Sequence, residues 1–186
     1  MVRLLIVWAL LAVSAGCGGD DEAIPTDRLR ELVLQPEDVA DGLERFEEGR
    51  LTATDLPSGA RRDPARFGRA GGWKARYRAA GGGDADGMLV IESRVDSFAD
   101  SEGASRDLDA LRSEVRGADA ELGDEALVTT TSQEAEPRAI SFTTVAWRRG
   151  TVTASVLVQG YADALESDAV LELARKQDAR IERASE

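Results

Sequence analysis

The feature that most constrains the fold is the regular alternation of side-chain type in the segment 73–79. In the sequence WKARYRA every second residue is apolar, and the residues between them are basic. A repeat of two residues predicts a β-strand with one buried and one exposed face. The segment 88–95 also places Leu89, Ile91 and Val95 on one face. The Gly-rich loop 81–87 separates the two segments, which together predict an antiparallel hairpin.

The C-terminal half predicts a second hairpin and one further strand. The segments 140–147 and 152–159 flank the turn 148–151, in which Gly150 supplies any positive φ. The segment 125–132 predicts the further strand.

Two amphipathic helices complete the regular structure. Asp100 or Ser101 caps the first and Ser167 the second, because their side chains accept hydrogen bonds from the free N–H groups of a first helical turn. The buried stripe of the first helix is expected at Ala104, Leu108, Leu111 and Val115. That of the second is expected at Val170, Leu173, Ala174, Gln177 and Ile181.

The order ββαβββα predicts an α+β fold, with an antiparallel sheet of about five strands packed by amphipathic helices. Upstream, Thr26 is expected to cap a short helix and Pro36 to begin another helical turn. The segment 47–72 contains Pro57, Pro64 and five Gly. We expect an irregular surface stretch there.

The N-terminus has the three parts of an export signal. Arg3 supplies a positive charge, residues 4–13 (LLIVWALLAV) are apolar, and small residues precede Cys17, the only cysteine of the chain. The apolar run is about half of the ~20 residues that a membrane-spanning helix needs. We therefore expect a signal peptide over 1–16, a flexible tether over 17–25 and a single soluble domain over 26–186.

The residues before the cysteine resemble the lipobox of bacterial lipoproteins. Ala15, Gly16 and Cys17 match it, whereas Ser14 stands where Leu is commonest. The resemblance implies that Cys17 carries a thioether-linked diacylglycerol and often a third, amide-linked acyl chain, which together anchor a protein stably to a membrane. It predicts a lipid-anchored protein on the extracytoplasmic face of the cell membrane, labelled by palmitate. The alternative is an ordinary secretory signal followed by a free surface thiol.

Composition restricts both partners and chemistry. The formal net charge is −12, and loss of residues 1–16 with Arg3 makes it −13, which argues against nucleic acid as a partner. The chain has no His and one Cys. The usual proton shuttle and the common zinc ligands are therefore missing. Ser-x-x-Lys and P-loop patterns are also absent. We predict no catalytic residue, no metal site and no cofactor.

Carboxylates are the remaining catalytic candidates, because a glycosidase needs only two of them. The candidates are Glu37, Asp38, Asp124 and Glu125. Among 35 acidic residues, neighbouring acids are expected by chance, and solvated surface charge is the favoured interpretation. The sequence 84–87 (DADG) is similar to the opening of a calcium loop. It lacks the later acidic ligands of that motif, and an ordinary loop is favoured.

The residues 61–78 contain seven basic residues and one acid. Such a segment suits an anionic ligand, such as lipid headgroups, wall-polymer phosphates or an acidic partner. The candidate contacts are Arg66, Arg69, Trp73, Arg76 and Arg78. Internal ion pairs, for example between Arg76 and Glu92 on facing strands, are the favoured alternative. The aromatic residues Trp73, Tyr77 and Trp147 could line a cleft, although core packing is favoured.

The C-terminal half resembles a known group of proteins. The sequences LGDEA at 122–126, VAWRRGTVTASVLVQG at 145–160 and LARKQDARI at 173–181 are similar to uncharacterised lipoproteins of high-GC Gram-positive (actinobacterial) cell envelopes. Mycobacterial relatives of sensor-kinase extracellular domains and the PsbP-like fold share a comparable arrangement of sheet and helices. The resemblance covers about 120–182. It implies a small binding or accessory domain and transfers no catalytic residue.

The sequence thus predicts a lipid-anchored, non-catalytic envelope domain that binds or senses a small ligand or an envelope protein. A pocket between sheet and helix would favour a small ligand, and a closed interface would favour protein contact. The rival functions are a carboxylate-dependent hydrolase of wall polysaccharide and a structural accessory subunit of an envelope complex.

Overall fold

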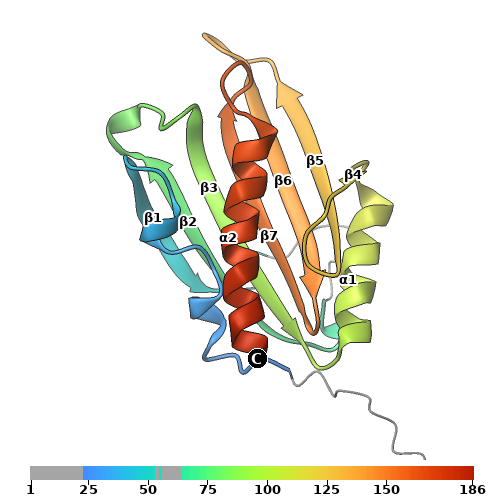
Figure 1. Ribbon diagram of the computed structural model, residues 1–186. Coiled ribbons are helices and arrows are strands. Elements are labelled where there is room, and N and C mark those ends of the chain that lie inside the picture. Colours follow the sequence, from blue (N-terminus) through green and yellow to red (C-terminus); the bar gives the residue numbers. More distant parts are fainter. Residues whose placement is uncertain (1–22, 53–54, 56–63) are drawn as a thin grey trace, which may run out of the picture.

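The computed structural model of the chain describes residues 23–52, 55 and 64–186. Its centre is one antiparallel sheet of seven strands in the order β1-β2-β3-β7-β6-β5-β4 (Figure 1). The strands are β1 (Leu43–Arg50), β2 (Arg69–Ala79), β3 (Met88–Phe98), β4 (Ala118–Asp119), β5 (Glu125–Gln133), β6 (Ile140–Arg149) and β7 (Val152–Tyr161). The helices are α1 (Ser101–Glu114) and α2 (Ser167–Ser185). Short 3₁₀ turns are η1 (Leu29–Glu31), η2 (Pro36–Asp38), η5 (Pro64–Phe67) and η6 (Ala80–Gly82).

The α+β class and both predicted hairpins are confirmed, but the prediction of about five strands is too low. The sequence did not predict β1 and β4. Five of the eight residues of β1 are charged, so its sequence shows no alternation of apolar and polar residues. An edge strand tolerates this because it needs no continuous apolar face. β4 has only two residues, too few to show a period. The predicted irregular stretch 47–72 is wrong at both ends, where β1 and β2 extend into it.

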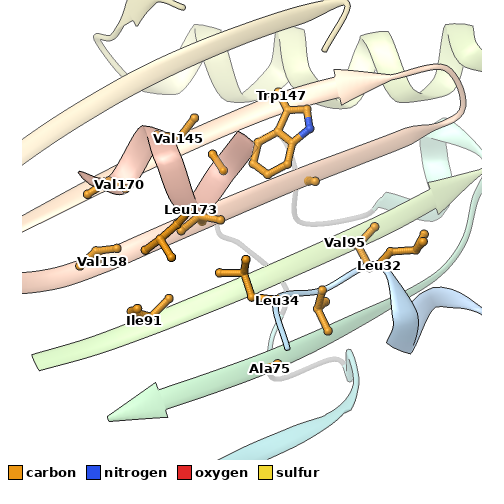
Figure 2. Packing of buried hydrophobic residues seen from close by; sticks show 14 of the residues in the cluster. Leu32, Leu34, Ala75, Ile91, Val95, Val145, Trp147, Val158, Val170 and Leu173 are labelled. Atoms are coloured by element: carbon orange, nitrogen blue, oxygen red, sulfur yellow. The ribbon is translucent and has the colours of Figure 1, made fainter. Parts of the chain in front are cut away.

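The main core lies between the sheet and α2 (Figure 2). Alternate residues of the central strands face the helix, among them Val145 and Trp147 of β6 and Ile91 and Val95 of β3. The predicted stripe of α2 is confirmed, since Val170, Leu173, Ala174, Gln177 and Ile181 are all buried. The helix begins at Ser167 and its N-cap residue is Glu166, so the predicted capping by Ser167 is wrong by one position.

The opposite face of the sheet is covered at one end by α1. Leu108 of α1 packs with Leu127 of β5 and Ala146 of β6. The residues next to Leu127 and Ala146 in the sequence belong to the core on the α2 side. The side chain of Asp100 accepts a hydrogen bond from the Gly103 N–H at 2.7 Å, which confirms Asp100 as the N-cap of α1. The helix thus buries its own, smaller apolar stripe.

The N-terminal part of the domain also lies over the α2 face. The helix predicted after Thr26 is only the 3₁₀ turn η1, and the helical turn predicted at Pro36 is η2. Leu32, Val33 and Leu34 between these turns are almost fully buried in the main core. This segment therefore joins the core rather than the surface.

Among the residues described, no helix combines the length and the apolar character needed to cross a bilayer.

Candidate functional site

The basic residues predicted to bind an anion lie on β2, and the strand directs them to different places. Trp73 faces the α2 side, where it packs partly buried against the main core. Successive side chains of a strand point to opposite faces of the sheet. Arg76 and Arg78 lie three and five residues after Trp73, so their side chains are on the face opposite to that of Trp73. Side chains on opposite faces of one strand cannot converge on one ligand, so this candidate set is not one site.

The basic residues of β2 are instead paired with acids of neighbouring segments. Arg76 contacts Glu47 of β1 at 3.0 Å and Glu92 of β3 at 2.8 Å. Lys74 contacts Glu47 at 2.5 Å and also binds Asp55. At the start of β2, Arg69 forms an ion pair with Asp96 of β3. The favoured interpretation of the basic segment, internal pairing, is confirmed for these three cations.

These contacts shift the acids and bases toward their charged forms. Hydrogen bonds from Lys74 and Arg76 hold the pKa of Glu47 below its ordinary value. Hydrogen bonds from Lys74 and Thr52 hold the pKa of Asp55 far below its ordinary value. Burial alone would lower the pKa of Lys74, but its bonds to Asp55 and Glu47 outweigh burial and raise that pKa. The cluster is an internal ionic network in which Arg69, Lys74 and Arg76 each have an acidic partner.

Arg78 differs from Lys74 and Arg76 on β2 because its side chain is exposed. Its guanidinium lies 5.4 Å from the ring centre of Phe46, and that of Arg76 lies 6.0 Å from the same ring centre. Phe46 is 43% exposed and is the one exposed large hydrophobic residue among those described. It sits where β1 shifts register between Arg45 and Glu47. Sequence reasoning missed Phe46 because its strand was not predicted.

Other predicted residues lie outside what the structure describes. They are Cys17, Arg61, Arg62 and the side chain of Arg66. Their predicted roles stay predictions.

Of the three aromatic residues favoured as core, Tyr77 and Trp147 are fully buried, and Trp73 packs partly buried against the core. Tyr77 is fully buried and donates its hydroxyl to the Leu34 carbonyl at 2.6 Å. Burial raises the pKa of this hydroxyl to about 12. Trp147 is also fully buried, and its indole N–H donates to Asp178 of α2 at 3.0 Å. Neither ring lines a cleft.

The interface between the sheet and α2 is closed by packing and by a buried polar chain. The Leu34 N–H donates to Ser93 Oγ at 2.9 Å, and Ser93 Oγ donates to Gln177 Oε1 at 2.8 Å. The amide nitrogen of Gln177 donates to the Arg94 carbonyl at 2.9 Å. Ser93 and Gln177 are both 0% exposed. These bonds join the N-terminal segment, β3 and α2 at the place where a pocket between sheet and helix would lie.

A cavity of about 780 Å³ lies elsewhere, at the end of the domain where the described chain begins and ends. Its walls come from residues 23–25, the β6–β7 turn and the last turn of α2, with Arg28 and Asp124 beside them. Arg149, the last residue of β6, already binds Asp178 at 2.6 Å and Glu182 at 3.3 Å. The cavity is polar, and much of its charge is paired within the protein.

The four candidate carboxylates are ion-paired in two separate places. Glu37 and Asp38 contact Arg180 of α2 at 3.0 and 2.8 Å. Asp124 and Glu125 contact Arg148 of β6 at 2.8 and 3.3 Å. Each pair shares one arginine, so the acids are positioned by a cation and do not face each other across a cleft as a glycosidase pair does.

The described part of the chain contains no candidate metal site. No three residues among its Asp, Glu, His and Cys side chains are grouped so that they could hold a metal ion. In the loop similar to a calcium motif, Asp84 accepts a hydrogen bond from the Gly87 N–H at 2.9 Å. That bond closes a turn before β3.

Comparison with known proteins gives a likeness of fold. No protein-family model matches the chain, and no curated protein matches it. The structure is similar to the extracellular domain of PknH from Mycobacterium tuberculosis, with a TM-score of 0.58 and 12% sequence identity. The similarity covers 88% of this chain and 99% of that domain. At this identity it shows the fold alone, which agrees with the expected arrangement of sheet and helices.

Proposed function

We propose that the protein is a lipid-anchored domain on the extracytoplasmic face of the cell membrane, and that it binds another envelope protein without catalysing a reaction. The closed interface between α2 and the sheet carries the proposal. Trp147, Gln177 and Ser93 are fully buried there, which leaves no room for a small ligand between the helix and the sheet. Recognition is then assigned to the outer surface.

The likeness to the extracellular domain of PknH supports the extracytoplasmic location. It is also compatible with a non-catalytic role. The acids that a hydrolase would use are paired with Arg148 and Arg180.

The lipid anchor orients the domain. Six peptide units separate Cys17 from Ala23, and such a chain reaches at most about 20 Å. Ala23 lines the cavity together with Ser185 at the end of α2. An acylated Cys17 would hold this end next to the bilayer and direct the opposite end of the sheet away from it.

The anchor is tested by palmitate labelling of cells that produce the protein or its Cys17→Ser variant. We expect label in the first and none in the second. Equal labelling of the two, or none in either, contradicts the anchor.

The binding role is tested by crosslinking in living cells. A photoreactive amino acid is placed in turn at exposed positions on three sides of the domain: Phe46 on β1, Thr131 on β5 and Arg175 on α2. We expect a protein adduct of defined mass from at least one position. A surface that gives no adduct at any position, with a small molecule retained in native mass spectra, contradicts the proposal.

The cavity supports a second candidate, the binding of a small polar ligand. Its volume of about 780 Å³ is within the range of small-molecule sites. The Arg149→Ala variant should then lose a small molecule that native mass spectrometry detects in the unmodified protein.

A further inference from the structure

The two edges of the sheet are built differently. β1 forms one edge, and it carries five charged residues and a register shift between Arg45 and Glu47. Charge and irregularity are the usual protections of an edge strand against pairing with another chain. The other edge is β4, which covers only Leu127 and Val128 of β5. From Thr129 to Gln133, β5 itself is therefore the edge (Figure 1).

This open edge lacks the protections found on β1. The sequence 129–133 is TTTSQ, without charge or proline, and residues 130–133 are exposed. Three consecutive Thr residues favour the extended backbone. The register with β6 is regular from Glu125↔Arg148 to Gln133↔Ile140, so no β-bulge interrupts this pairing.

The hydrogen-bonding groups that this edge offers can be identified. The Ala126 carbonyl points outward, since it accepts from the Ala120 N–H at 3.4 Å and from Arg112 Nη2 at 3.2 Å. Backbone direction repeats every second residue in a strand. The N–H and C=O groups of Thr130 and Ser132 therefore point outward too. No backbone hydrogen bond from another described segment reaches them.

The position of the edge suits a partner outside the membrane. β5 begins beside Asp124, which lines the cavity at the end nearest the proposed anchor. Eight residues later the strand has risen about 26 Å from that end. Ser132 is thus directed away from the bilayer.

Charge indicates what kind of chain fits. Exposed Glu134 and Glu136 follow the edge directly. The end of the edge next to β4 carries charges of both signs, on Arg116 and Asp119. Asp119 forms an ion pair with Arg112 at 2.7 Å. A segment with an uncharged, extended core and basic residues beside Glu134 complements this pattern.

A second copy of the chain fits less well. Each copy has a net charge of −12, which opposes self-association. Two β5 edges pairing antiparallel would also point the cavity ends of the two domains in opposite directions. Lipid anchors in one membrane disfavour that arrangement.

We propose that the β5 edge from Thr129 to Gln133 binds an extended, basic-flanked segment of a partner protein, which adds a strand to the sheet. This inference rests on the proposed binding function and assigns its surface. Backbone hydrogen bonds at Thr130 and Ser132 give the attachment, and Glu134 and Glu136 select basic flanks.

The test measures amide hydrogen exchange at single residues in the purified full-length protein. The probe is the synthetic peptide KKTVTVTKK, and the comparison peptide is EETVTVTEE. At saturating KKTVTVTKK we expect exchange at Thr130 and Ser132 to slow by on the order of 10-fold. The amides of Thr129 and Thr131 point toward β6 and should change little. The acidic peptide should have less than a third of the effect.

Two matched variants separate backbone pairing from side-chain contact. Ser132→Pro removes one outward N–H without removing a bond to β6, a substitution that an edge strand tolerates. It should abolish the slowing at Thr130. Ser132→Ala keeps the N–H and should preserve it. Unchanged melting temperatures of both variants establish that the fold is intact.

Three results would overturn the inference. They are no slowing with the basic peptide, equal slowing with the acidic peptide, and slowing without peptide that grows with protein concentration, which would assign the edge to a second copy. If the edge fails while crosslinks at Phe46 or Arg175 persist, the binding function stands and only its surface is wrong.

Discussion

Replacement of Gln177 by Met tests whether the buried polar chain holds α2 closed on the sheet. Gln177 is 0% exposed, and its amide makes two hydrogen bonds, to Ser93 Oγ at 2.8 Å and to the Arg94 carbonyl at 2.9 Å. Met has a similar volume and no comparable polar group. The change therefore removes the bonds and creates little empty space.

The expected loss of stability follows from the partners left behind. A hydrogen bond contributes about 1 kcal/mol net, and a buried group left without its partner costs roughly 1–3 kcal/mol. In the variant the Ser93 hydroxyl still accepts a hydrogen bond from the Leu34 N–H and loses only the bond that it donates, so only part of that cost applies at Ser93. We expect Gln177→Met to lower the free energy of unfolding by about 2–4 kcal/mol. For a chain of this size that corresponds to a fall in melting temperature of roughly 5–12 °C.

Urea unfolding followed by circular dichroism measures the loss, with Arg175→Met on the exposed side of α2 as the control. The control should lie within about 0.5 kcal/mol of the unmodified protein. A double-mutant cycle with Ser93→Ala should give a coupling of about 1–2 kcal/mol, since both variants break the same bond. A Gln177→Met protein as stable as the control, or a cycle with additive losses, refutes the role of the chain in closing the interface.

Two further predictions concern the ionic network and the core. Asp55→Asn should lower the free energy of unfolding at pH 7 by about 1 kcal/mol. Because Lys74 and Thr52 hold the folded pKa of Asp55 below its ordinary value of 3.8, this contribution is complete above pH 3.8 and is lost progressively as the pH falls from there toward the folded pKa. Urea unfolding at pH 7 and pH 3 should show a smaller difference at pH 3, and an equal difference would contradict the lowered pKa. Trp147→Phe removes the bond to Asp178 and part of a buried ring, and thermal unfolding should show a loss of about 2–3 kcal/mol. A variant as stable as the parent would show that the indole N–H contributes nothing.

The amino-acid sequence determined those parts of the protein that a short stretch specifies by its own pattern. The alternation in β2, the turn at Gly150 and the apolar stripe of α2 each arise from neighbours along the chain. The class of fold follows from them. The apolar segment 4–13 and the small residues before Cys17 likewise predict lipidation of that cysteine by their own local pattern.

Only the tertiary structure decided which surfaces are free. β1 and β4 owe their pairing to strands distant in sequence, and their own residues show no period. For the basic segment 61–78 the sequence favoured internal pairing but left an anionic ligand open. The fold brings Asp96 of β3 against Arg69, and Glu47 of β1 and Glu92 of β3 against Arg76. The open edge at Thr130 and Ser132 exists because β4 ends after two residues. A strand is an edge strand when no other strand pairs with one of its sides. Pairing is between segments distant in the sequence, so the residues of the strand do not by themselves specify it.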